Sequence, residues 1–198
     1  MNLEQVVEYI WNNSHEINFG ESDAWDDNTF LYAWFNDNYP DKWVTGKDRP
    51  GWYWFSVDSS LLSELESIQR PEQLPLNACN FGAVFTENEM LFGGELVHNK
   101  LETKVIYNGH ESNVISRIRS HFSVSNDRTG ALGIKHYDSL SAERWTVHMF
   151  LKQHLDLDDD LSNEDKLQIK RLCDSKIGRV AIEQAWRSRF GWPALSKA

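Results

Sequence analysis

The chain has 198 residues, of which 40% are apolar and nine are tryptophan, enough for one domain with a well-filled core. This composition excludes a disordered chain, and no apolar run is long enough to cross a bilayer, so we expect no membrane partner. The polar, acidic N-terminal stretch is unlike a signal peptide, and two cysteines without metal-ligand spacing favour a reducing cytoplasm.

The formal net charge of −10 disfavours phosphate binding, because phosphate binding depends on cations. The charge is unevenly distributed along the chain, however. Residues 1–60 hold eleven acidic and three basic residues, and residues 156–165 hold six acids, whereas residues 166–198 hold eight basic and two acidic residues. A basic C-terminal segment can still line a positive cleft, so a nucleic-acid partner remains compatible with the charge.

The N-terminal part of the chain predicts helices and one strand. Apolar residues at helical spacing indicate an amphipathic helix over residues 3–17, and a second helix is expected over residues 25–38. A loop rich in proline and glycine follows. Residues 51–57 are aromatic and β-branched, which predicts a strand. Ser59 then begins a short predicted helix that the next prolines end.

The middle of the chain predicts two further strands around a helix. Residues 80–98 alternate between apolar patches and turn residues, which indicates a hairpin or an irregular insertion. Residues 104–109 predict a strand that ends at a glycine, and residues 113–122 predict the helix that follows it. Residues 145–151 predict the third strand of the sheet.

The C-terminal part predicts two helices after an acidic loop. The acidic run lacks the central glycine and the closing glutamate of an EF-hand, so it is no calcium loop of that type. Helices are expected over residues 163–173 and 175–190, and the Gly191-Trp192-Pro193 sequence ends the second one.

The stretch from Lys104 to Phe122 carries the most informative polar residues. Tyr107 lies near the predicted end of a strand, and Arg117 and His121 lie four residues apart on the next helix, where they share one face. Such a pair is also what an ordinary solvated helix face presents. If the three side chains converge, they would suit cleavage of a phosphodiester bond.

These spacings resemble the GIY-YIG nuclease family. Tyr107-Asn108-Gly109 matches the Y-I-G element, with Asn108 in place of the usual apolar residue, and Arg117 and His121 fall at the family's helix positions. Gly51-Trp52-Tyr53 is the best match to the G-I-Y element, and Glu183 on the last helix matches the metal-binding glutamate. The resemblance covers roughly residues 50–58 and 103–193.

The resemblance implies a role for each site residue. Tyr53 would act as the general base, and Tyr107 would shape the same pocket. Arg117 would hold the scissile phosphate, while His121 would hydrogen-bond the phosphate or a tyrosine oxygen. Glu183 would bind Mg²⁺ or Mn²⁺, with water and phosphate oxygens completing the coordination.

The family pattern also implies a domain organisation. Residues 1–49 would be an N-terminal helical, tryptophan-rich extension, and residues 50–198 the nuclease-like domain, with an insertion at about 58–102 because the two tyrosines are 54 positions apart. Gly82-Ala83-Val84 is a rival for the first strand element, but it has no tyrosine.

We therefore expect an α/β (α+β) fold, with a small, mostly antiparallel sheet flanked by helices. The expected function is that of a metal-dependent endonuclease acting on DNA, as a possible homodimer because duplex cleavage needs two sites. The alternatives are a catalytically silent nucleic-acid-binding module and a protein-interaction module. Arg179 and Arg187 lie four residues before and after Glu183, so an ordinary salt-bridged helix also explains that glutamate.

Overall fold

The structure is a computed structural model that describes six segments of the chain. They are residues 1–19, 49–57, 64–97, 104–122, 130–141 and 143–197. The helix predicted over residues 25–38 lies outside the described residues, as does the start of the helix predicted from Ser59.

One antiparallel sheet with the strand order β1-β4-β2-β3 forms the centre of the fold. The strands are β1 (His15–Phe19), β2 (Gly51–Val57), β3 (Val105–Glu111) and β4 (Trp145–Leu151). The three predicted strands are confirmed, although β3 continues two residues beyond Gly109. Tyr107 therefore lies within a strand and not at its end.

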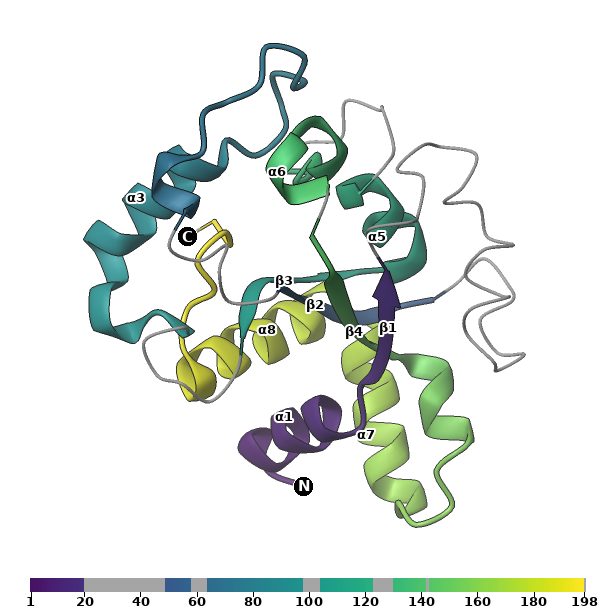
Figure 1. The fold of residues 1–198 in the computed structure, drawn as a ribbon. Coiled ribbons are helices and arrows are strands. Elements are labelled where there is room, and N and C mark those ends of the chain that lie inside the picture. Colours follow the sequence, from purple (N-terminus) through teal and green to yellow (C-terminus); the bar gives the residue numbers. More distant parts are fainter. Residues whose placement is uncertain (20–48, 58–63, 98–103, 123–129, 142, 198) are drawn as a thin grey trace.

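Helices cover both faces of this sheet (Figure 1). One face carries α1 (Leu3–Asn12), α7 (Asn163–Asp174) and α8 (Lys176–Phe190), and the other carries α3 (Phe81–Phe92), α5 (Val114–Phe122) and α6 (Asp138–Ser141). Short 3₁₀ turns lie at η3 (Leu65–Ser67), η4 (Gly93–Glu95), η5 (Ile134–His136) and η6 (Lys152–Asp156). The predicted α+β class is confirmed. None of the described helices is long and apolar enough to cross a membrane.

Two separate cores follow from the alternation of side chains along β2. Trp52 and Trp54 pack with α1, α7 and α8, whereas Tyr53 and Phe55 pack with α3, α5 and α6 on the opposite face. All four side chains are at most 1% exposed. Residues 52–55 are consecutive aromatic residues, as suits a strand with both faces buried.

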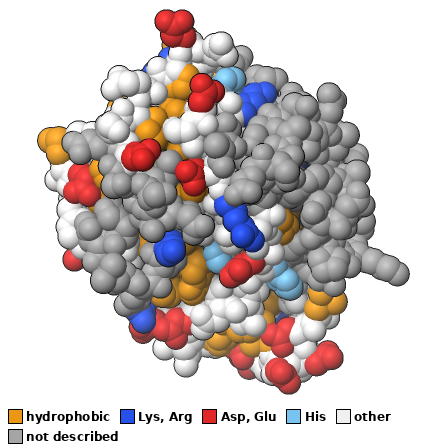
Figure 2. All heavy atoms as spheres, viewed as in Figure 1, with side chains coloured by type: hydrophobic (Ala, Val, Ile, Leu, Met, Phe, Trp, Pro, Cys, Tyr) orange, Lys and Arg blue, Asp and Glu red, His pale blue; other side chains and the backbone are white. Residues whose placement is uncertain are grey.

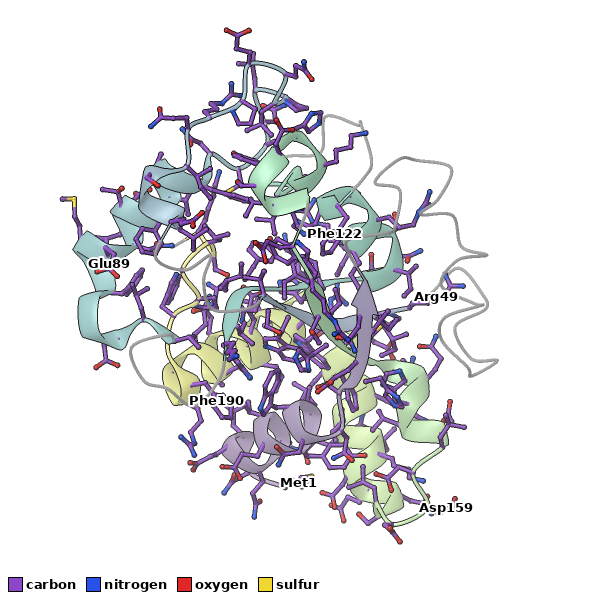
Figure 3. The ribbon with its side chains drawn as sticks, viewed as in Figure 1. Met1, Arg49, Glu89, Phe122, Asp159 and Phe190 are labelled. Atoms are coloured by element: carbon purple, nitrogen blue, oxygen red, sulfur yellow. The ribbon has the colours of Figure 1, made fainter. Side chains whose placement is uncertain are left out.

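The labelled side chains of Figure 3 show the same division. Phe122 at the end of α5 lies on one side of the sheet, and Phe190 at the end of α8 lies on the other. Side chains from the two faces of the sheet can therefore meet only at one of its edges.

The helix predicted over residues 3–17 is wrong in its second half. It ends at Asn12, and the chain continues into β1, which pairs with β4. The Asn13 amide donates to the Tyr9 carbonyl and the Ser14 hydroxyl donates to the Trp11 carbonyl. These short polar side chains bond the last carbonyls of the helix and so stop it. Residues 3–19 thus supply one helix and one edge strand of the same sheet.

The hairpin or irregular insertion predicted over residues 80–98 is also wrong. This stretch forms α3, whose Phe81, Val84 and Phe85 are buried at helical spacing against the core. Gly93, with φ of 44°, ends the helix and gave the misleading turn signal. Gly82-Ala83-Val84 lies in this helix, so it is no alternative to β2 as the first strand element.

The helices predicted in the second half of the chain are confirmed. Asn113 caps α5 by accepting a hydrogen bond from the Ser116 amide, and the predicted stripe of Val114, Ile118 and Phe122 is fully buried. Ser175 caps α8 by accepting from the Gly178 amide at 2.9 Å. The two helices that carry predicted site residues are thus fixed at their starts by local hydrogen bonds.

Candidate active site

A β-bulge in β3 lies beside Tyr107. Phe55 pairs with Tyr107 but Ser56 pairs with Val105, so Ile106 is an extra residue in the strand. Ile106 and Tyr107 consequently face the same side of the sheet, whereas regular alternation would place them on opposite sides. As the partner of Phe55, Tyr107 lies on the face that also carries Tyr53, and the bulge turns Val105 to the opposite core.

Tyr53 crosses over the neighbouring strand at Gly109, its partner in the ladder. A β-carbon built on Gly109 would lie 2.7 Å from Cζ of Tyr53 and closer still to its hydroxyl oxygen. Only glycine leaves room for the phenol to lie flat across β3. The glycine of the Tyr107-Asn108-Gly109 sequence therefore determines where the Tyr53 hydroxyl lies.

His121 is fully buried at the end of α5 and does not lie on a solvated helix face. Its Nε2 lies 3.0 Å from the Tyr53 hydroxyl, and its Nδ1 accepts a hydrogen bond of 3.1 Å from the Leu132 amide. Burial lowers the pKa of His121 well below its ordinary value, and the Arg117 charge lowers it further. The imidazole is therefore neutral at neutral pH.

Arg117 brings positive charge to the two phenols. Its side chain lines the same pocket as Tyr53 and Tyr107, close enough for its charge to act on both hydroxyl groups. Burial acts to lower the pKa of Arg117, but the two phenols outweigh it, so the pKa lies above its ordinary value. Burial raises the pKa of both tyrosines, and Arg117 opposes that rise. The cluster is a pair of phenols held by one fixed cation.

A pocket of about 350 Å³ opens beside β3 and collects most of the predicted residues. Tyr53, Tyr107, Arg117 and Glu183 all line it, and His121 lies behind Tyr53 without lining it. Because β3 is an edge strand, the pocket is bounded by side chains from both faces of the sheet. The four lining residues come from β2, β3, α5 and α8, far apart in the sequence.

Glu183 reaches the pocket from α8. Arg187 donates a hydrogen bond to Oε1 of Glu183, and Oε2 lies 3.6 Å from Nε2 of His110. Burial raises the pKa of Glu183, an effect that Arg187 opposes. Burial also disfavours the charged form of His110 and lowers its pKa to about 4, so that ring is neutral at neutral pH. Arg179, the other predicted ion-pair partner, instead donates to the Cys173 carbonyl.

The described part of the pocket offers a divalent cation one or two carboxylates, Glu183 and Glu111. Among the residues that the structure describes, no three His, Cys, Asp or Glu side chains form a metal-binding group. The Glu183 side chain nevertheless lines the pocket, and its Oε2 lies 3.6 Å from Nε2 of the neutral His110 ring. A hard cation that takes one protein oxygen and completes its shell with water and phosphate fits this donor set.

The C-terminal segment forms a wall of the pocket that the sequence did not predict. Arg187 donates from Nε to the Asn108 side chain at 3.0 Å and from Nη1 to the Lys197 carbonyl. Ser196 bonds the same Asn108 side chain, and the Leu195 amide donates to the Ile106 carbonyl at the bulge. In the sequence, the only sign of this set of hydrogen bonds is that Arg187 lies four residues after Glu183.

The charges of the pocket favour an anionic ligand by a small margin. Arg117, Arg187 and Lys197 line it together with Glu111 and Glu183. Over the face of the molecule drawn in Figure 2, acidic and basic side chains are interspersed. The small excess of positive charge in the pocket itself could therefore attract a polyanion.

Comparisons with family models, curated proteins and solved structures found no match to this chain.

Proposed function

We propose that this protein is a metal-dependent endonuclease that hydrolyses phosphodiester bonds, with DNA as its substrate. The supporting observation is that Tyr53, Tyr107, Arg117 and Glu183 line one pocket although they come from four separate elements. An ordinary salt-bridged helix and an ordinary aromatic strand do not require this convergence. Duplex cleavage needs two such sites, so the working form is a homodimer. The two buried free cysteines support a cytoplasmic setting.

The residues divide the chemistry in the following way. A phenol of the tyrosine pair takes the proton of the attacking water, and Arg117 holds the non-bridging phosphate oxygens as negative charge builds on them. His121 fixes the Tyr53 hydroxyl from behind. Glu183 would hold Mg²⁺ or Mn²⁺ through Oε2, and such a cation supplies charge stabilisation to the leaving oxygen.

Plasmid cleavage tests this proposal. Wild-type protein with Mg²⁺ is expected to nick or linearise supercoiled DNA, and EDTA should abolish the reaction. Arg117→Met and Glu183→Gln should each lower the rate by about 10²-fold or more. Glu72→Gln, on an exposed residue outside the pocket, is the matched control for the glutamate change. Full activity of both pocket variants would refute the proposal.

The ion pair between Arg187 and Glu183 favours a second candidate, a catalytically silent nucleic-acid-binding module. With its charge already balanced by Arg187, Glu183 needs no metal to be stable in the pocket. This candidate predicts DNA binding that weakens steeply with salt but is unchanged by EDTA. Binding without cleavage, at the same affinity in Mg²⁺ and EDTA, would favour it over the endonuclease.

A further inference from the structure

Arg179 is a buried cation without a carboxylate partner. It is 6% exposed, and among the residues that the structure describes it forms no ion pair. Glu183, one turn later on α8, bonds Arg187 instead. Taking a charge out of water is costly unless an opposite charge replaces the lost hydration. A buried arginine without such a charge therefore needs a physical explanation.

The hydrogen bonds of this guanidinium are also incomplete. Of its five N–H donors, one on Nη1 bonds the Cys173 carbonyl at 2.6 Å, and Nε is buried without a hydrogen-bond partner in the described part of the chain. The Cys173 carbonyl lies in the last turn of α7, where the helix end carries about half a negative charge. This contact, which any arginine that caps a helix can make, offsets only part of the positive charge.

The backbone of Arg179 is fixed as well. Indole Nε1 of the buried Trp52 donates to the Arg179 carbonyl at 2.9 Å, which connects α8 to β2. The Arg179 amide donates to the Ser175 carbonyl at 3.0 Å in the first turn of α8. Contacts with α7 and β2 thus hold the guanidinium at a defined place before any ligand binds, which lowers the cost of binding one.

Arg179 lines a pocket of about 460 Å³ that is separate from the candidate active site. The two acids of this pocket are already paired, Asp174 with Lys152 at 2.6 Å and Asp156 with Lys170 at 2.6 Å. These five residues comprise three cations and two carboxylates, so one positive charge remains unbalanced. The remaining charge is the buried one of Arg179, and it favours an anionic ligand.

The two pockets are neighbours along β3 and α8. Glu111 lines the first pocket, and the next residue, Ser112, lines the second. Glu183 and Arg179 are four residues apart on α8, a spacing that separates β-carbons by about 5–6 Å. Phosphates along one strand of B-DNA follow each other about every 3.4 Å of the helix axis. A strand with one phosphate beside Glu183 would therefore carry a phosphate one or two nucleotides away near Arg179.

We infer that the pocket around Arg179 is a binding site for a phosphate group, and that its occupant is a backbone phosphate close to the scissile one. The phosphate site stands on Arg179 and its pocket alone, whereas its place beside the scissile bond rests on the proposed nuclease function. A phosphate oxygen accepts hydrogen bonds from the guanidinium, and its charge takes the place of the missing carboxylate. Arg179 thus positions the strand and takes no part in bond cleavage.

Inorganic phosphate tests this site without any nucleic acid. The Nε–H group of Arg179 gives a ¹H–¹⁵N signal, which Arg179→Lys identifies by its loss. We expect the signal to shift to saturation as phosphate is added, and to stay in place with chloride at the same ionic strength. The shift should persist in Arg117→Met, which removes a cation of the first pocket. A signal that does not respond, or that responds only while Arg117 is present, would overturn the inference.

DNA offers the same chemical group from a second source. Binding of a labelled duplex in EDTA is measured by fluorescence anisotropy between about 50 and 200 mM salt. Loss of one phosphate contact in Arg179→Met should reduce the slope of log K against log salt by about 0.9. Arg171→Met, on an exposed residue of α7 outside the pocket, is the matched control and should keep the wild-type slope.

A wild-type slope in folded Arg179→Met would overturn the assignment to the DNA backbone. Thermal denaturation checks the folding of each variant. Where Arg179→Met does not fold, Arg179→Gln replaces it, because glutamine removes the charge but keeps an N–H donor for the Cys173 carbonyl.

The two measurements separate the phosphate site from the function on which its place rests. If phosphate shifts the Arg179 signal but the protein neither binds nor cleaves DNA, the proposed function fails and the phosphate site stands. If the protein cleaves DNA but phosphate leaves the Arg179 signal unchanged, the nuclease stands and the phosphate site fails.

Discussion

The Tyr53 phenol lies against the α-carbon of Gly109, at a distance that leaves no room for a β-carbon. The two residues are ladder partners on adjacent antiparallel strands. One strand thus supplies the phenol, and the glycine of the other strand leaves the space in which the ring lies.

Gly109→Ala should therefore move the Tyr53 ring. The added methyl group would meet Cζ at 2.7 Å, and we expect overpacking to lower the free energy of unfolding by about 1–3 kcal/mol. Urea denaturation measures the change. Gly94→Ala is the matched control, because a β-carbon there meets nothing within 4 Å. Equal effects of the two substitutions would contradict the predicted contact.

Glu183 should make stability depend on Mg²⁺. A ligand that binds only the folded state at about ten times its Kd raises the free energy of unfolding by about 1.4 kcal/mol. We expect this increase in the wild-type protein and its loss in Glu183→Gln, as measured by thermal denaturation with Mg²⁺ or EDTA. Glu72→Gln should behave as wild type, and a Mg²⁺ effect that survives in Glu183→Gln would place the cation elsewhere.

Arg187 should be important for stability as well as for the site. It is 7% exposed, and its loss would leave the half-buried Glu183 carboxylate without its donor and the Asn108 side-chain oxygen with the Ser196 hydroxyl alone. Arg187→Ala is expected to lower the free energy of unfolding by about 3–5 kcal/mol, the cost of breaking a buried ion pair. Arg171→Ala, on an exposed residue of α7, should change it by less than about 0.5 kcal/mol. A similarly small effect at Arg187 would mean that water replaces the pair.

Acid should destabilise the protein through its buried histidines. Burial lowers the pKa of His110 to about 4, that of His154 to about 2, and that of His121 well below its usual value. In the unfolded chain these groups take up protons near pH 6.5, so their contribution is complete above that pH and is lost as pH falls.

Each of these histidines should contribute a slope approaching about 1.4 kcal/mol per pH unit once the pH is well below 6.5. Urea titrations between about pH 6.5 and 5, above the ordinary carboxylate range, measure it. His121→Asn should reduce the slope by one proton. A stability that is flat over this range would show that the rings are protonated in the folded state.

The sequence predicted best those elements whose local signals agree with their environment. Residues 51–57 and 145–151 are short and apolar, and they are buried strands; the capped helices around Arg117 and Glu183 also begin where predicted. The prediction for residues 80–98 was wrong because the glycines at 93 and 94 follow the end of a helix. Glycine is favoured both after a helix and in the turn of a hairpin, so it does not distinguish the two.

The candidate site shows a similar limit. Single positions such as Tyr107 and Glu183 could be proposed from the resemblance to the family pattern, because each lies on a predicted strand or helix. Lys197, Ser196 and Asn108 could not, since they meet only through the packing of the C-terminal segment on β3. Such contacts depend on tertiary structure, for which local spacing carries no signal.

The extra residue at Ile106 has a consequence for how the chain tolerates change. Because the bulge reverses the facing of every residue on one side of it relative to the other, the site depends on the number of residues in β3 as well as on their identity. Deleting Ile106 would leave Val105 and Tyr107 adjacent and opposite Ser56 and Phe55, a regular ladder in which both keep their present faces, so its cost should be the loss of a buried side chain and of the carbonyl that accepts from the Leu195 amide. A deletion of Asn108 would instead turn either Tyr107 or Gly109 to the opposite face, and should therefore be the more damaging of the two for the site.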